Sequence, residues 1–350
     1  MSAQPAELPR KAPIYLYAIV PARQGIDEAI GVDSVPDRLW TIAPGPFAAV
    51  VGDGPNVEGR SREELMLRLL SHQKTIERIM QAAPLLPVKF GTFAPDEACV
   101  RAMLACGGPA FKAAFDRLAG CVQVEIFVKW DVETVFAEIA KEEAITGLKK
   151  KWELHVGPSD EALRVVLGGL VKQSLERRRA ALAASLFGTL RTVAADAIAC
   201  PVAADQVALH AVLLMKTGET AALDGCLEDL DATYGGRLAF RCVGPLAPYS
   251  FATVEIEIVE AAALDQAMRL LGVGPAADAA EVRAAYRRAV KSVHPDATGE
   301  SAGGSASMAA LGEAHRILSL HAEAGGDPHP SDRSVFVSVR RQEIAFDAAA

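Results

Sequence analysis

The stretch CVQVEIFVKWD, residues 121–131, decides the fold class of this chain. Apolar and more polar residues alternate along it, with Val122, Val124, Ile126 and Val128 on one side and Gln123, Glu125, Phe127 and Lys129 on the other. This period of two predicts a β-strand with one buried face and one wet face. Such strands are typical of antiparallel sheets with helices on one side, so we expect an α+β fold.

Further strands and helices precede this stretch. β-Branched and aromatic residues predict a strand at residues 12–22, and a Pro-Gly-Pro turn joins two short strands within residues 39–53. A capping box of Ser61 and Glu64 predicts the start of a helix. The apolar stripe of this helix is Leu65, Leu69, His72, Ile76 and Ile79. Two shorter helices are expected within residues 96–120, separated by Gly-Gly-Pro.

A second set of elements follows the opening stretch. We expect a helix, a polar break at residues 146–160 and a long helix that starts at residue 160. The Glu-Arg-Arg-Arg run at residues 176–179 is interpreted as a solvated helix face rather than a nucleic-acid site. Strand, helix, strand and strand patterns then lead to residue 260. We therefore predict two ferredoxin-like α+β units linked by a long helix, with domains at residues 12–147 and 158–260.

The composition disfavours several classes of partner. The 350 residues carry a formal net charge of −8, which opposes unspecific binding to nucleic acid. No apolar run approaches the roughly eighteen residues of a membrane span, and the N-terminus lacks a secretory signal, so we expect a cytosolic protein without a membrane partner. The six cysteines form no Cys-x-x-Cys pair. We interpret them as buried apolar residues rather than disulfides or zinc ligands.

The sequence lacks the motifs of common enzyme classes. It contains no glycine-rich phosphate loop and no Gly-x-Ser-x-Gly elbow, and its seven histidines include no His-Glu-x-x-His pair. His210 lies in an apolar strand and is interpreted as a core residue. We expect no catalytic residue, no cofactor and no metal. A small-molecule enzyme on a ferredoxin-like scaffold is the alternative, which a deep pocket with convergent polar groups would favour.

Three segments carry a resemblance to a known family. They read IYLYAIVPA at residues 14–22, LLPVKFGTF at residues 85–93 and GPLAPYSFATVEIE at residues 244–257. In this order and spacing they resemble the gas vesicle protein GvpL/GvpF family over residues 12–260. The family motif positions are Pro87, Phe90, Gly91, Gly244, Pro245, Pro248, Tyr249, Ser250 and Phe251. These residue types suit turns and a core rather than catalysis. Ala247 departs from the family pattern, which often has a second proline there.

The last quarter of the chain has a different pattern. Helical periods run through residues 263–273, 277–293 and 307–320, and Asp278 is a suitable N-cap for the second helix. One face of that helix is basic, with Arg283, Arg287, Arg288 and Lys291. His294, Pro295 and Asp296 follow it. Residues 262–322 thus resemble a J-domain, the DnaJ-type module. A helical hairpin without that activity is the alternative.

Together the two resemblances imply a function. The first implies a non-enzymatic accessory or minor structural protein of gas vesicles, which contacts the small, very hydrophobic shell protein GvpA and other gas vesicle accessory proteins. The second implies docking of a DnaK-type chaperone through the basic helix and the His-Pro-Asp loop, with stimulation of its ATP hydrolysis. A general co-chaperone for other clients is the alternative. The tail, residues 323–350, is expected to be flexible or to add a strand to a neighbouring sheet.

Overall fold

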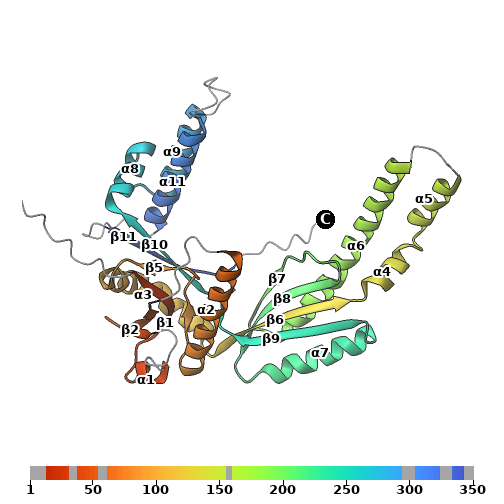
Figure 1. Ribbon diagram of the computed structural model, residues 1–350, viewed down its shortest axis with the longest axis horizontal. Helices are drawn as coiled ribbons and strands as arrows, with labels where there is room; N and C mark the ends of the chain where they lie inside the picture. The colour runs from red at the N-terminus through yellow and green to blue at the C-terminus, as the bar shows by residue number, and fades with distance from the viewer. Residues whose placement is uncertain are drawn as a thin grey trace, which may run out of the picture. The chain divides into compact units, whose positions relative to one another are not determined.

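Helices and antiparallel sheets build two units in the computed structural model of the chain (Figure 1). The structure describes residues 13–30, 38–53, 61–154, 160–293, 304–323 and 333–342. The first unit comprises Met1–Arg117 and Thr253–Arg340, and the second comprises Leu118–Ala252 and Arg341–Ala350. This architecture confirms the predicted α+β class.

A sheet with the strand order β2-β3-β1-β4 forms the centre of the first unit, and β5 also pairs with β1. The strands are β1 (Ile14–Pro21), β2 (Leu39–Ile42), β3 (Phe47–Gly52), β4 (Leu86–Pro87) and β5 (Phe93–Ala94). The helices are α1 (Ile26–Ile30), α2 (Arg62–Ala82) and α3 (Glu97–Leu118). The first six elements, β1-α1-β2-β3-α2-β4, follow the order of a ferredoxin-like fold. The predicted hairpin around Pro-Gly-Pro is β2–β3.

Helix α2 starts as predicted, but only its second half is buried. The Ser61 hydroxyl accepts the Glu64 N–H and the Glu64 carboxylate accepts the Ser61 N–H, both at 3.2 Å, which confirms the capping box. The predicted stripe is buried from His72 onwards. The stripe positions before it, Leu65 and Leu69, are exposed, so this part of the prediction was wrong. Five large exposed apolar side chains form what we call the α2 apolar patch: Leu65, Met66, Leu67, Leu69 and Leu70.

The two short helices predicted around Gly-Gly-Pro are one continuous helix, α3, so this prediction was wrong. A proline inside a helix leaves the carbonyl four residues earlier without its N–H partner. Here that residue is Ala105, and both Ala105 and Pro109 are exposed, so water can bind the carbonyl. On the opposite face, buried apolar side chains such as Phe111 and Met103 keep the two halves of α3 together.

His72 lies in an aromatic cluster between α2 and the sheet. Its Nδ1 is 2.9 Å from the hydroxyl of Tyr15, and the ring of Tyr17 stacks on it with 5.5 Å between centroids. The Tyr15 hydroxyl accepts the Gly91 N–H at 3.2 Å, so it donates its own proton to Nδ1. Burial lowers the pKa of His72 to about 4, so the imidazole is neutral in the folded state at neutral pH.

This burial predicts a loss of stability in acid. The pKa of His72 is 6.5 when unfolded and about 4 when folded, so its stabilisation is complete above pH 6.5 and is lost as the pH falls toward 4. The full effect is about 3 kcal/mol in the free energy of unfolding. In His72→Gln, whose amide oxygen still accepts from Tyr15, urea unfolding between pH 7 and 4.5 should show a correspondingly smaller loss. An equal loss in both proteins would contradict this.

The second unit also has the ferredoxin-like order, β6-α6-β7-β8-α7-β9, with the sheet order β7-β8-β6-β9. Its strands are β6 (Cys121–Trp130), β7 (Asp196–Cys200), β8 (Val207–Lys216) and β9 (Leu238–Leu246). Its helices are α4 (Val132–Ile139), α5 (Glu143–Leu154), α6 (Asp160–Leu190) and α7 (Thr220–Tyr234). Strand β6, assigned from the sequence to the domain at residues 12–147, pairs with β8 and β9 and lies in this sheet instead.

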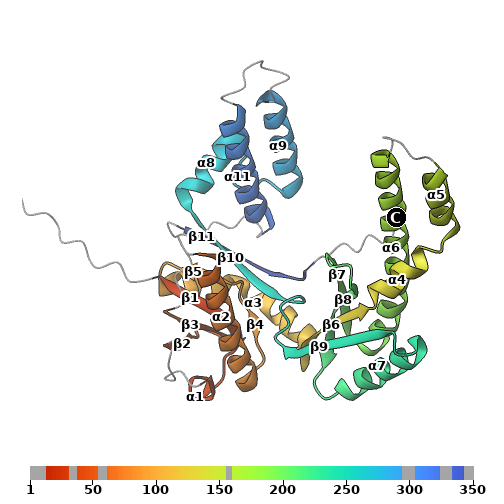
Figure 2. The same ribbon diagram turned by 45° about the vertical axis from the view of Figure 1, so that its right-hand side comes forward.

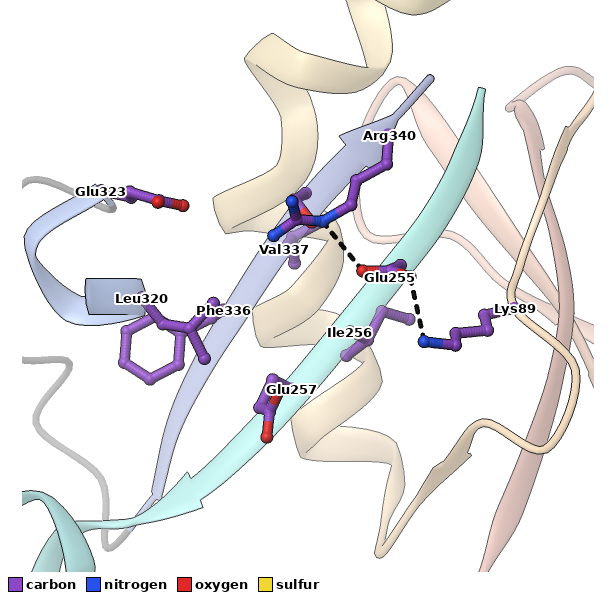
Figure 3. Close-up of a pocket in the computed structure, with 10 residues that line it drawn as sticks. Lys89, Glu255, Ile256, Glu257, Leu320, Glu323, Phe336, Val337 and Arg340 are labelled. Carbon is purple, nitrogen blue, oxygen red and sulfur yellow. Dashed lines mark hydrogen bonds and ion pairs between the residues drawn. The ribbon is translucent and has the colours of Figure 1, made fainter. Parts of the chain in front are cut away.

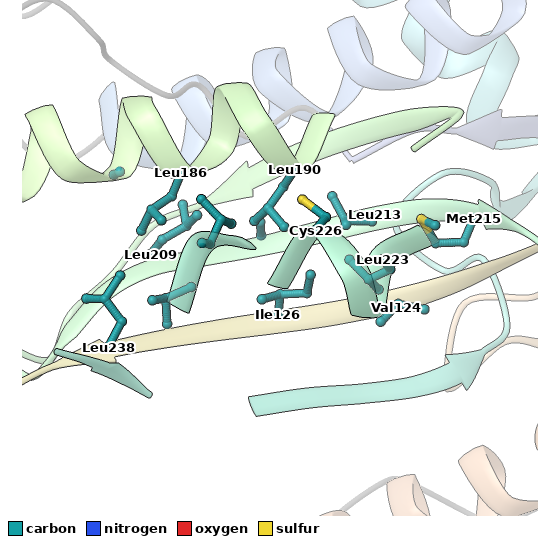
Figure 4. Close-up of a cluster of buried hydrophobic side chains, with 14 residues drawn as sticks. Val124, Ile126, Leu186, Leu190, Leu209, Leu213, Met215, Leu223, Cys226 and Leu238 are labelled. Atoms are coloured by element: carbon teal, nitrogen blue, oxygen red, sulfur yellow. The ribbon is translucent and has the colours of Figure 1, made fainter. Parts of the chain in front are cut away.

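The core of the second unit lies between its sheet and the helices α6 and α7 (Figure 4). Leu186 and Leu190 of α6 and Leu223 of α7 pack on the apolar face of β6, where Val124 and Ile126 are buried. The long helix expected as a linker between the units therefore packs with its second half on this sheet. The predicted alternation of β6 explains why a single face of the strand carries the contact.

Helices α4, α5 and the first half of α6 extend beyond the sheet of the second unit (Figure 2). Ile139, Ile145 and Leu175 form a small buried core among them. We call residues 132–175 the helical arm. The polar break predicted at residues 146–160 was wrong up to Leu154, which ends α5, and at Asp160, which starts α6. Residues 155–159 lie outside the described ranges.

The last part of the first unit is a two-stranded ribbon, and a helical module lies between its two strands in the sequence. Strand β10 (Thr253–Glu260) leads directly into α8 (Ala261–Leu271), α9 (Ala279–Val293) and α11 (Gly304–Glu323), and the chain returns in β11 (Arg333–Arg340). All eight residues of β10 pair with β11 in antiparallel register. The tail expected to be flexible or to add a strand therefore contains a strand. Within the described ranges, every helix is too short or too polar to span a lipid bilayer.

Candidate functional site

The C-terminal helical module, residues 261–323, is fixed by local signals at its helix ends. Gly272 ends α8 in the left-handed conformation with a φ of 64°, and its N–H bonds to the Met268 carbonyl. Asp278 caps α9 as predicted, because its carboxylate accepts the N–H groups of Ala280 and Glu281 at 2.8 Å each. The Glu281 carboxylate in turn accepts the Asp278 N–H at 3.0 Å, which completes a capping box.

Apolar faces of the three described helices meet in one core. The buried members from the helices are Leu264, Ala267, Leu271, Val282, Ala285, Leu311, Ala314, Ile317 and Leu318. Tyr286 of α9 contacts His315 of α11 with 4.4 Å between ring centroids. The buried His321 ring lies 2.9 Å from the Pro275 carbonyl through Nε2 and so ties the end of α11 to the loop after α8. This core fixes the orientation of α9.

The basic face predicted on α9 is exposed. Arg283, Arg287, Arg288 and Lys291 all point away from the core, which Val282 and Ala285 enter from the opposite face. Four cations along one helix give a positive surface in a chain of net charge −8. Such a surface attracts an acidic partner and accelerates its association. His294, Pro295 and Asp296 lie outside the described residues.

The first family motif lies where β4 meets the central strand of the first unit. Pro87 is buried in β4 opposite Ala18 of β1. Phe90 packs edge-on against His72 with 5.4 Å between centroids. Gly91 has a φ of 84°, which favours glycine, and donates its N–H to the Tyr15 hydroxyl. These residues shape a turn under the aromatic cluster.

The second family motif connects β9 to the ribbon. A side chain at Gly244 would place its Cβ 2.9 Å from the Gln123 carbonyl oxygen, so the close approach of β9 to β6 requires glycine. The carbonyl of Pro248 accepts the Phe251 N–H at 3.0 Å and closes a turn. Pro245, next to Gly244, is exposed, and Tyr249 is half-buried.

Buried contacts hold this turn in place within the second unit. The Ser250 N–H donates to the Gln123 side-chain oxygen at 2.9 Å, and both side chains are buried. The ring of Phe251 is 1 % exposed, and the guanidinium of Arg341 lies over it at 5.9 Å. The role expected for Phe251 as a core side chain therefore agrees with its position.

The arginine run at residues 177–179, expected to be a solvated face, makes ion pairs instead. Arg178 donates to the carboxylate of Glu138 at 2.7 Å and to that of Glu142 at 2.9 Å, which joins α6 to α4 and to the start of α5. Arg179 pairs with Asp205 at 3.0 Å. The run thus holds the helical arm in place, which sequence patterns could not reveal because the acidic partners are far away along the chain.

Arg178 is expected to stabilise the helical arm measurably. Arg178→Ala removes hydrogen bonds to two carboxylates from a side chain that is two-thirds buried, for which we expect a cost of about 1–3 kcal/mol. Amide hydrogen exchange in α4 and α5 should accelerate accordingly. Arg177→Ala is the matched control, because this side chain is 66 % exposed and its loss should cost at most about 0.5 kcal/mol. Equal exchange rates in both variants would contradict the assignment.

Histidine and cysteine side chains do not gather into a metal site in the described part of the chain. Cys106 and Cys242 are exposed, so their interpretation as buried apolar residues was wrong. His210 is not a simple core residue either. Its Nε2 lies 3.7 Å from the Glu125 carboxylate, and Cys200 and Glu125 raise the pKa of His210 to about 9.

A groove of about 290 Å³ opens on one face of the ribbon (Figure 3). Its lining includes Leu320, Phe336 and the charged side chains of Lys89, Glu255 and Arg340. Lys89 and Arg340 both pair with Glu255, at 3.0 and 2.9 Å. The two cations are therefore satisfied by this carboxylate rather than presented to a ligand, and the groove gives no support to the enzyme alternative.

Comparison with known proteins adds two matches. The family model for "Gas vesicle synthesis protein GvpL/GvpF" matches residues 13–253, and the model for "DnaJ domain" matches residues 267–323. The structures of GvpF from Anabaena sp. PCC7120 and from Microcystis aeruginosa are similar to this chain, with TM-scores of 0.55 and 0.50. Each is 20% identical in sequence and covers 69% of this chain and 98% of its own. Comparison with curated proteins gives no match.

Proposed function

Because the chain belongs to the gas vesicle GvpL/GvpF family, we propose that it is a gas vesicle assembly factor that brings a DnaK-type chaperone to the hydrophobic shell protein. One observation carries the proposal. A body matched by this family continues, in the same chain, into a helical module matched by the DnaJ model, with an exposed basic α9. We assign no catalytic step to the chain itself.

The α2 apolar patch is our candidate for the surface that binds the shell protein. Leu67 is 67 % exposed and Met66 is 51 % exposed. Because the five patch residues are close together in the sequence, they point in several directions around the helix. A helix that is apolar on several sides is stable in water only when another surface covers it. A small, very hydrophobic subunit supplies such a surface.

The C-terminal helical module is our candidate for the chaperone-binding site. In this proposal Arg283, Arg287, Arg288 and Lys291 attract an acidic surface of the chaperone, and His294, Pro295 and Asp296 act on its ATPase. The body holds a shell subunit while the module recruits the chaperone. Joining the two binding events in one chain raises the local concentration of chaperone at the subunit without any new contact. The protein then acts in the cytoplasm and at the growing vesicle.

Binding of the shell protein should depend on the α2 apolar patch. We expect the double variant Leu67→Ser, Leu70→Ser to retain at most about a tenth of the wild-type affinity for immobilised shell protein, because two exposed large side chains leave the interface. Val165→Ser, Val166→Ser on α6 is the control, since these valines are 70 % and 51 % exposed outside the patch. Equal loss in both variants, or binding of any apolar client as strongly as the shell protein, would contradict this assignment.

A further inference from the structure

The C-terminal helical module is an insertion between two paired strands. Strand β10 ends at Glu260 and α8 starts at Ala261, so no linker separates the ribbon from the module at this end. After the module, β11 returns and pairs with β10 along its whole length, up to the pair of Glu260 with Arg333. The side chains of this pair also meet, with 2.8 Å between the Arg333 Nε and the Glu260 carboxylate. Both ends of the module are therefore attached to the same ribbon.

One face of the ribbon belongs to the core of the module. Phe336 of β11 and Val259 of β10 are buried among its helices. The ring of Phe336 lies edge-on to His321 at 6.3 Å between centroids. On the same face, Arg316 of α11 pairs with Glu257 of β10. The module therefore packs on the ribbon and is not only connected to it.

The other face of the ribbon packs on the rest of the first unit. Val337 contacts α3 so closely that a Cβ added to Gly107 would lie 2.9 Å from its Cγ1. Arg333 reaches Asp96, just before α3, at 3.2 Å. The edge of the ribbon is also joined to this unit, because the Val254 carbonyl of β10 accepts the Lys89 N–H at 3.0 Å. Since side chains alternate along β11, Phe336 faces the module while Val335, Val337 and Val339 face the first unit.

We propose that β11 holds the helical module in one fixed orientation on the rest of the first unit. Without β11, the module would keep its covalent connection at Glu260 and its contacts with Val259 and Glu257 of β10. It would lose Phe336 and the contact of β11 with α3, so its orientation would vary. With β11 in place, a chaperone docked on α9 is presented at a constant angle to the surface of the rest of the first unit. The benefit of this angle for shell-protein delivery rests on the proposed function, whereas the fixed orientation does not.

The test is a distance distribution between two spin labels in the full chain. Noncanonical amino acids would carry the labels at Lys112 of α3 and Gln266 of α8, which are both exposed, so the native cysteines stay in place. Wild type should give one narrow distribution. The triple variant Val335→Ser, Val337→Ser, Val339→Ser removes the apolar contact with the first unit and keeps Phe336, so its distribution should be at least about twice as broad. The control variant Val165→Ser, Val166→Ser should keep the narrow distance distribution of wild type.

Two outcomes would overturn the proposal: a broad distribution in wild type, or a narrow one in the triple variant. Stimulation of a DnaK ATPase by the triple variant checks that the module is still folded. If this stimulation is lost together with the helical signal, the milder Val337→Ser gives the same comparison. If wild type has a narrow distribution and never stimulates the chaperone, the proposed function fails while the fixed orientation stands.

Discussion

His294→Gln is expected to reduce stimulation of a DnaK ATPase to the basal rate of the chaperone. In our account the His-Pro-Asp segment acts on the ATPase, while α9 docks the module through its basic face. The substitution changes no residue of the module core and no basic residue of α9. The variant should therefore keep its circular dichroism spectrum and its melting temperature. The measurement is single-turnover ATP hydrolysis with increasing concentrations of the full chain.

Charge reversal on α9 should weaken the docking of the chaperone rather than abolish stimulation of its ATPase. Arg287→Glu replaces an exposed cation of the basic face, so we expect weaker docking that approaches wild type at saturating concentration. Since the attraction is electrostatic, wild-type docking itself should weaken as salt rises. Arg269→Glu on α8 is the matched control, because it makes an equal change of charge at an exposed position outside this face. Equal effects of both reversals would refute a specific role for α9.

Gly107→Ala is expected to be among the most destabilising single-methyl changes in the chain. An added Cβ would lie 2.4 Å from the ring of Phe111, which is fully buried, and 2.9 Å from Val337 of β11. Phe111 also contacts Phe47 of the sheet with 5.7 Å between centroids, so its ring has little room to move away. Overpacking of this kind should cost about 2–3 kcal/mol in the free energy of unfolding.

A glycine in another helix of the same unit provides the control. Nothing lies within 4 Å of a Cβ built at Gly312, which is inside α11 and is not followed by a proline. Gly312→Ala should therefore stabilise the protein by about 0.5–1 kcal/mol, since alanine favours the helix over glycine. Urea unfolding of the two variants should shift in opposite directions. A stabilising shift with Gly107→Ala would show that α3 does not pack as described.

Local signals in the sequence were sufficient for several elements. The capping box at Ser61, the N-cap at Asp278 and the alternation of β6 depend on residues within a few positions of each other, so sequence patterns reveal them. The resemblance of the two parts to the GvpL/GvpF family and to the J-domain was likewise carried by short segments and is confirmed by the family matches.

Features that depend on distant partners were missed. Strand β6 pairs with β8, more than seventy residues later, so nothing near it in the sequence shows that it starts the second unit. Helix α3 continues through Pro109 because its buried face packs on the sheet, which outweighs a local helix breaker. The partners of Arg178 and of β11 are likewise distant along the chain. The exposure of Leu65 and Leu69 on α2 could not be predicted either, since a helical period does not show how far the covering sheet extends.

The central claim is that one chain links the shell protein to a chaperone, and a capture experiment tests it most directly. Shell protein is immobilised, the full chain is added or withheld, and the DnaK retained in the presence of ATP is measured. We predict that DnaK is retained only with the full chain, and that His294→Gln abolishes this retention while the chain itself stays bound. Retention of DnaK without the chain, or equal retention with His294→Gln, would contradict the account.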